Sequence, residues 1–97
     1  MAEVSLHPAA EADYEAALAW YLARSPKAAA GFETAVEKAI EAVRDFPEAF
    51  PLRDDRHRHC PLRRYPYALV YRVAGDRVRV VAVPHDRQLP RDWSDRD

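Results

Sequence analysis

YALVYRVAGDRVRVVAVPH, residues 67–85, consists of two apolar runs separated by Ala74-Gly75-Asp76. The alternation of side chains predicts strands at 67–73 and 77–85, because successive residues of a strand face opposite sides of the sheet. Gly75 allows a tight turn, which joins the strands as an antiparallel hairpin. Regular alternation in the second strand predicts one face with Val78, Val80, Ala82 and Pro84 and an opposite face with Arg77, Arg79, Val81, Val83 and His85.

Two helices are expected upstream of this hairpin. Pro8 fits the first turn of a helix whose N-cap is His7, and Ser25-Pro26 stops this helix and begins another. The second helix is indicated by apolar residues that repeat at helical spacing, namely Phe32, Val36, Ala39, Ile40 and Val43, and it ends at Pro47. The short connection predicts that the two helices pack as an antiparallel hairpin.

Two further strands complete the expected sheet. Residues 2–6 alternate weakly, and residues 57–64 form a second candidate that Pro61 marks as an edge or bulged strand. The resulting order, β-α-α-β-β-β, predicts an α+β fold with an antiparallel-rich, twisted sheet and the helical hairpin packed on one face. The other face of the sheet is then left to water or to a partner.

Composition limits the class of protein. The 97 residues, 48% hydrophobic and 32% charged, suffice for one domain over residues 1–97 with a polar tail from about residue 88. Cys60 is the only cysteine, which excludes an intramolecular disulfide and predicts a small buried thiol. No run approaches the roughly 20 apolar residues of a membrane span, and the first residues lack a signal-peptide pattern. These features predict a cytoplasmic protein without a membrane partner.

The net charge of -1 conceals an uneven distribution. Residues 1–48 hold nine acidic and four basic residues, whereas residues 49–97 hold seven acidic residues and eleven arginines. Arginine favours planar contacts with phosphate and carboxylate, so the second half is expected to bind an anionic partner. The candidate binding residues are Arg58, Arg63, Arg64, Arg72, Arg79 and Trp93. The alternative is that the arginines only cover a solvated face.

Generic catalytic motifs are few. The chain has no Gly-rich phosphate loop, no nucleophile elbow and no CxxC. His57 and His59 share a face of the expected strand while Cys60 points away, so no metal site and no cofactor are expected. His85 suits proton transfer beside an anion, or a plain hydrogen bond at a strand end. Arg63-Arg64 suits a phosphate, or simply flanks a turn.

Three segments together resemble the RelE/ParE toxin superfamily. The first is Ser25-Pro26-Lys27-Ala28-Ala29, followed by Phe32 and Ala39-Ile40. The second is RYPYALVYRV, residues 64–73, and the third is VAVPHDRQLPRDW, residues 81–93. The resemblance spans nearly the whole chain. It implies a toxin of a bacterial type II toxin–antitoxin system, neutralised by a cognate antitoxin whose extended or helical segment docks on it.

Two targets compete within this superfamily. RelE-like members cut mRNA on the ribosome, which requires proton transfer and cations on the phosphate. By this resemblance, His85 would transfer the proton and Arg64 and Arg87 would hold the phosphate. Tyr71 would have an orienting role. ParE-like members bind and inhibit DNA gyrase.

The second half of the chain contains no lysine, although RelE-like sites rely on lysines there. Arginine stays protonated and is a poor substitute in proton transfer. We therefore favour the non-enzymatic, ParE-like role over the endoribonuclease. A third alternative is an inactive member kept for antitoxin binding and autoregulation.

Overall fold

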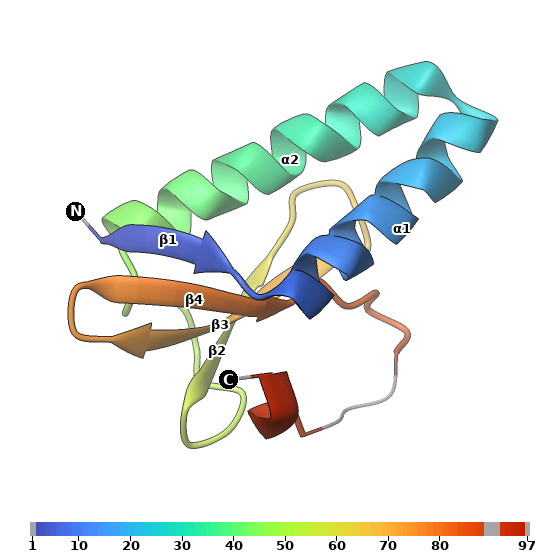
Figure 1. The fold of residues 1–97 in the computed structure, drawn as a ribbon. Helices are drawn as coiled ribbons and strands as arrows, with labels where there is room; N and C mark the ends of the chain where they lie inside the picture. Colours follow the sequence, from blue (N-terminus) through green and yellow to red (C-terminus); the bar gives the residue numbers. More distant parts are fainter. Residues whose placement is uncertain (1, 89–91, 97) are drawn as a thin grey trace.

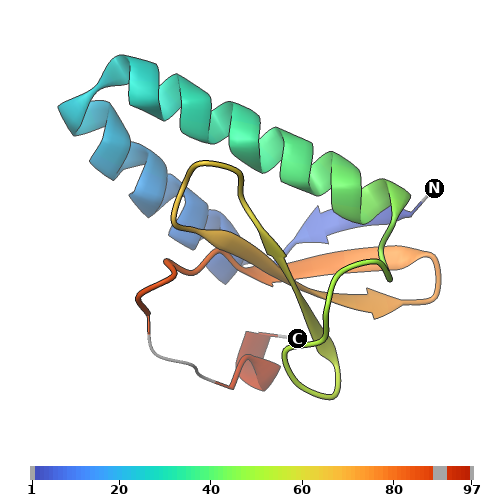
Figure 2. The same cartoon turned by 180° about the vertical axis from the view of Figure 1, so that it is seen from behind.

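The computed structural model describes residues 2–88 and 92–96 and places a helical hairpin across one face of a four-stranded sheet (Figures 1 and 2). The chain order is β1 (Glu3–Leu6), α1 (Pro8–Arg24), α2 (Pro26–Asp45), β2 (His57–Pro61), β3 (Ala68–Ala74), β4 (Arg77–Ala82) and the short helix η1 (Ser94–Arg96). This is the α+β arrangement that the sequence predicts. In the described residues, no helix is long and apolar enough to cross a membrane.

Both helices begin as the sequence predicts. The His7 ring accepts a hydrogen bond at Nδ1 from the Ala9 amide, at 3.0 Å. Ser25 both ends α1 and begins α2, because its amide donates to the Tyr21 carbonyl while its hydroxyl accepts from the Ala28 amide. A single residue therefore separates the helices, and this forces the antiparallel hairpin.

The sheet has the strand order β1-β4-β3-β2. β1 runs parallel to β4, whereas the pairs β3–β4 and β2–β3 are antiparallel. Gly75 has a φ of 63°, the left-handed conformation that a tight hairpin turn needs, which confirms the predicted hairpin. The predicted strand at 57–64 was too long: β2 ends at Pro61, which has no N–H to continue the ladder.

β4 departs from regular alternation at Val81. The pairs along β3 and β4 are Val70 with Ala82 and Tyr71 with Val80. Val81 is thus an extra residue in β4, a bulge that reverses the alternation beyond it. Ala82 packs on the face away from the helices and Val83 on the face toward them. The prediction for these two residues was wrong, since it assumed an unbroken strand.

The main core lies between the helices and the sheet. Its largest fully buried side chains are Phe32, Val43, Leu69, Tyr71, Val78 and Val80. Cys60 belongs to the same core and is 3% exposed, which confirms the expected buried thiol. Burial raises the pKa of this thiol to about 11, so it stays protonated and unreactive at neutral pH.

The sequence predicts that the opposite face of the sheet is left to water or to a partner. In the structure, this face is partly covered by the chain itself. The segment Asp92–Arg96 folds back beneath it (Figure 1). Trp93 is 1% exposed and packs with Val70, Val81 and Ala82. The Arg96 guanidinium donates to the Asp13 carboxylate of α1 at 2.7 Å and to the Val81 carbonyl at 3.2 Å. The rest of the expected tail, residues 89–91 and 97, lies outside the described residues.

Candidate functional site

His85 lies just beyond β4, where the chain leaves the sheet. Its Nδ1 accepts a hydrogen bond from the Arg87 amide at 3.0 Å, so the proton of the neutral ring sits on Nε2. The imidazole meets the Tyr67 ring edge-on, with 4.9 Å between centroids. These two contacts fix both the orientation and the tautomer of the ring.

His59 is brought into the same hollow as His85. This hollow, which we call the histidine hollow, has a volume of about 380 Å³, and its polar lining residues include Arg53 and Asp86. Burial and then the Arg53 guanidinium lower the pKa of His59, against an opposing effect of Asp86. His59 is therefore a neutral imidazole at pH 7, able to accept a proton. The sequence suggests only a metal-binding role for His59, and the orientation of the neighbouring residues on the expected strand argues against that role.

Arg64 lies elsewhere, together with Arg63. Both arginines line a depression of about 490 Å³ between α2 and the β2–β3 loop, which we call the α2 depression. Lys38 of α2 lines it from the other side. Neither arginine lines the histidine hollow. Arg64 and His85 thus line different hollows, although both are candidates for one nuclease site and their loops are joined by the hydrogen bond from the Asp86 amide to the Pro66 carbonyl at 2.7 Å.

Tyr71 is fully buried beneath the helices. Its hydroxyl donates to the Pro47 carbonyl at 2.7 Å, and burial raises the pKa of Tyr71 to about 12. Tyr71 therefore joins β3 to the chain that follows α2. In this position the hydroxyl does not face solvent or the histidine hollow.

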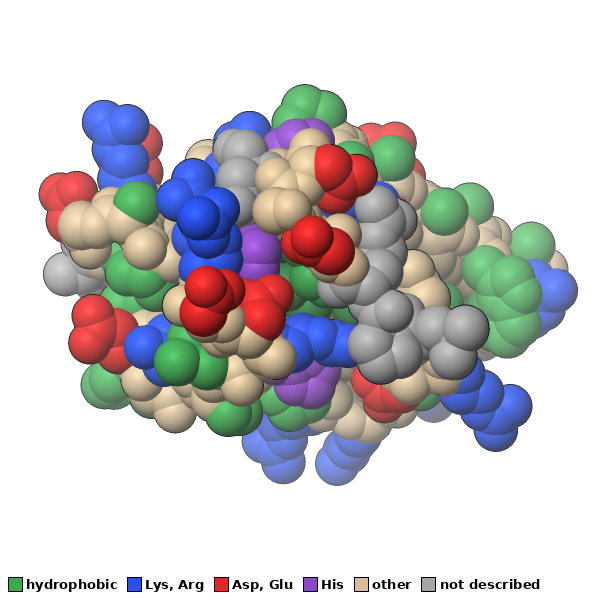
Figure 3. Space-filling model, turned by 90° about the horizontal axis from the view of Figure 1, so that it is seen from below, with side chains coloured by type: hydrophobic (Ala, Val, Ile, Leu, Met, Phe, Trp, Pro, Cys, Tyr) green, Lys and Arg blue, Asp and Glu red, His purple; other side chains and the backbone are tan. Residues whose placement is uncertain are grey.

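The remaining candidate binding residues occupy several places. Arg58 donates to the backbone carbonyls of Phe50 at 2.8 Å and Glu48 at 3.2 Å, and so holds the loop before β2. Arg72 and Arg79 face each other across β3 and β4. Arg79 also lies 3.3 Å from the Ser5 hydroxyl. Acidic and basic side chains are mixed on the face seen in Figure 3, which is the face away from the helices.

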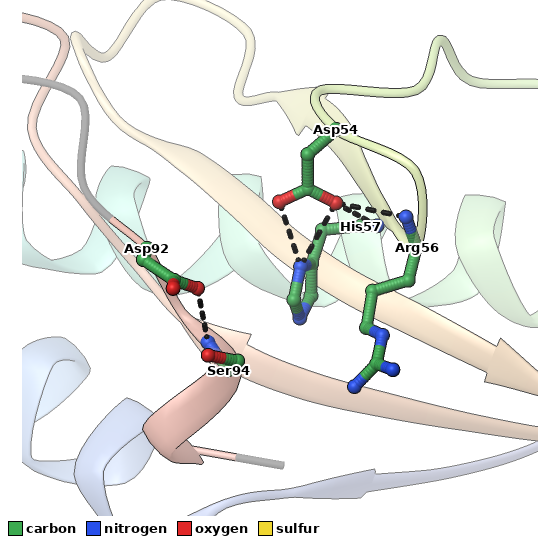
Figure 4. Close-up of polar contacts among 5 residues, drawn as sticks. All are labelled: Asp54, Arg56, His57, Asp92 and Ser94. Carbon is green, nitrogen blue, oxygen red and sulfur yellow. Dashed lines mark hydrogen bonds and ion pairs between the residues drawn. The ribbon is translucent and has the colours of Figure 1, made fainter.

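A carboxylate–histidine pair stands at the entrance to β2 (Figure 4). Asp54 accepts hydrogen bonds from the amides of Arg56 and His57, at 2.8 and 2.7 Å, and from Nδ1 of His57, at 2.9 Å. Burial raises the pKa of Asp54, but these hydrogen bonds outweigh it and lower the pKa to about 2. His57 is 1% exposed, so this carboxylate compensates a buried imidazole.

Asp92 lies near this pair at the start of the C-terminal segment. It accepts from the Ser94 amide at 2.9 Å (Figure 4). Within residues 2–88 and 92–96, no three His, Cys, Asp or Glu side chains are grouped as a metal site would need. The sequence offered no signal for the Asp54–His57 pair, because it depends on how the loop folds back on β2.

The fold is that of a known toxin–antitoxin protein. A solved structure titled "Chromosomal ParDE TA system from P. aeruginosa" superposes with a TM-score of 0.76 at 18% identity, covering 88% of this chain and 96% of that chain. At this identity the likeness concerns the fold alone. A search of curated proteins found no match.

The family follows from the sequence itself. The model of the ParE toxin of type II toxin–antitoxin systems, parDE, matches residues 4–90. The chain belongs to this family, on the ParE-like branch of the RelE/ParE superfamily. It is therefore a toxin of a type II toxin–antitoxin system.

Proposed function

We propose that this toxin arrests growth by binding DNA gyrase, without catalysing a reaction itself. The observation that carries the proposal is that two of the four nuclease candidates, Arg64 and Tyr71, do not line the hollow that contains His85, whereas Arg87 stays beside His85, to whose ring its amide donates. Arg64 lines the α2 depression instead, and the Tyr71 hydroxyl is bonded to the Pro47 carbonyl. Phosphodiester cleavage needs its acid, base and cations within hydrogen-bond reach of one phosphate.

The partner in the cell is a cognate antitoxin. The family is defined by such pairs, and the solved relative is titled as a ParDE system. The antitoxin is expected to neutralise the toxin by covering part of its surface. Exposed apolar side chains of the helical hairpin, Trp20 at 51% and Leu22 at 57%, offer contact area for it.

A supercoiling assay tests the gyrase proposal directly. Purified toxin should block ATP-dependent supercoiling of relaxed plasmid, and an excess of antitoxin should restore it. The variant His85→Ala should still inhibit, because binding does not use a proton-transfer group. Intact supercoiling at a toxin concentration that stops growth contradicts the proposal.

One observation favours the ribosome-dependent endoribonuclease as a second candidate. His59 and His85 line one hollow with Arg53, which supplies two titratable groups and a cation. In that case RNA fragments cut at the ribosomal A site should accumulate in cells. His59→Ala and His85→Ala should each slow cleavage by about 100-fold or more, the usual contribution of an acid or base.

A third outcome concerns the inactive alternative. Survival of cells that overproduce the wild-type chain alone indicates an inactive member.

A further inference from the structure

The α2 depression is lined by three cationic side chains, Lys38, Arg63 and Arg64. All three are exposed. None has a hydrogen bond or ion pair with any other described residue of the chain. Three unpaired positive charges around one hollow create a local positive potential, although the whole chain carries a net charge of -1.

No acidic residue of α2 is among the residues that line this depression, although Glu41 lies one helical turn from Lys38. Burial and then the carboxylates of Glu33 and Glu37 raise the pKa of Tyr14 on α1. Neither of these two glutamates lines the α2 depression, whereas Lys38 does. The charged side chains that line the depression are therefore all positive.

The loop that carries the arginines is held in place. The Tyr65 hydroxyl donates to the Ala28 carbonyl of α2 at 2.8 Å, and its ring packs edge-on against Tyr21 and Phe32. Gly31 makes room for that hydroxyl, since a Cβ there would collide with it. Arg64 has a φ of 68°, a conformation uncommon outside glycine and often found at functional sites.

The lining favours a phosphate backbone over a peptide. The floor consists of the small residues Ala30, Gly31, Thr34 and Ala35. None of these four side chains is a large apolar group against which the anchor residue of a peptide partner would pack. The Tyr65 ring is packed against other aromatic rings, so it is not free to stack on the bases of a single strand. Guanidinium groups match phosphate geometry well.

We propose that the α2 depression binds the phosphate backbone of duplex DNA, with Lys38 on one side and Arg63 and Arg64 on the other. This proposal goes beyond the gyrase proposal. It is tested without gyrase, so the two can fail separately.

Fluorescence anisotropy of the full chain with a labelled 15-base-pair duplex measures the binding over a series of salt concentrations. The triple variant Lys38→Gln/Arg63→Gln/Arg64→Gln should bind at least tenfold more weakly at low salt. The slope of log K against log salt should fall by about 2 to 3, since each phosphate contact contributes about 0.9. The control Arg24→Gln/Arg44→Gln/Arg77→Gln removes the same charge elsewhere and should retain most of the affinity.

Four outcomes overturn the proposal. They are an equal loss in both triple variants, no binding by the wild-type chain at low salt, preference for a single-stranded RNA of the same length, and a loss of antitoxin affinity without a loss of DNA affinity. The last would assign the depression to an acidic peptide segment. Circular dichroism of both variants checks that the fold is retained.

Discussion

Asp54 organises the turn that leads into β2. One carboxylate accepts from two backbone amides and from the ring of a buried histidine, although its own side chain is 40% exposed. Hydrogen bonds to the charged form lower its pKa to about 2, from an ordinary value of 3.8. The charged form is therefore stabilised in the folded state more than in the unfolded chain.

The pH dependence of stability follows from this shift. A carboxyl whose folded pKa is depressed stabilises the protein above its unfolded pKa and loses that contribution as pH falls through the folded value. Asp54→Asn should lower the free energy of unfolding by about 1 kcal/mol at pH 7, a value reduced for solvent screening. Urea unfolding of wild type and variant should converge between pH 4 and pH 2. Asp55→Asn, an exposed neighbour, is the control; a constant difference across this range contradicts the assignment.

Single residues also show how far the sequence could be interpreted. The caps at His7 and Ser25 were predictable, since capping depends on neighbours in the chain. That His59 and His85 line one hollow was not predictable, because it depends on strand pairing and on the path of the chain after β4. That Arg64 and His85 line different hollows could not be predicted for the same reason.

The contact between α2 and the β2–β3 loop depends on the absence of one side chain. Alanine normally stabilises a helix relative to glycine, by about 1 kcal/mol. At Gly31 a Cβ would collide with the Tyr65 hydroxyl, whose ring is confined by Tyr21 and Phe32. The tight contact between helix and loop therefore outweighs helix propensity at this position.

Gly31→Ala should consequently destabilise the protein, by about 1–3 kcal/mol, the usual cost of overpacking. Tyr65→Phe alone loses one hydrogen bond, at about 1 kcal/mol. In the double variant the collision is relieved, so it should be more stable than the sum of the single effects predicts. Urea unfolding of all four proteins gives the coupling energy. An additive cycle would show that the hydroxyl does not restrict residue 31.

The strands show a second limit of sequence-based prediction. The β3–β4 hairpin was predictable from alternation and from Gly75. The bulge at Val81 was not, because an extra residue in an apolar run leaves no mark on composition. Because of this bulge, Val81 and Ala82 both lie on the face of the sheet where Trp93 packs.

The two layers and the C-terminal segment are joined through a few side chains. Asp13 of α1 accepts from the Val83 amide at 3.1 Å and from Arg96 at 2.7 Å. Trp93 packs on the opposite face of the sheet, and its ring centroid lies 5.0 Å from the Arg96 guanidinium. The segment is thus tied to helix and sheet at once, which the polar composition of the tail did not indicate.

This connection predicts that the molecule unfolds as one unit. Trp93 is 1% exposed whereas Trp20 is 51% exposed, so Trp20→Phe leaves a reporter for the C-terminal segment. In that variant, Trp93 fluorescence and far-UV circular dichroism should give the same urea midpoint, as expected for a small two-state protein. Arg96→Ala removes the link to Asp13 and should shift the fluorescence midpoint below the dichroism midpoint. If the two midpoints already differ with Arg96 present, the segment detaches independently, and the Asp13–Arg96 pair does not couple it to the helical layer.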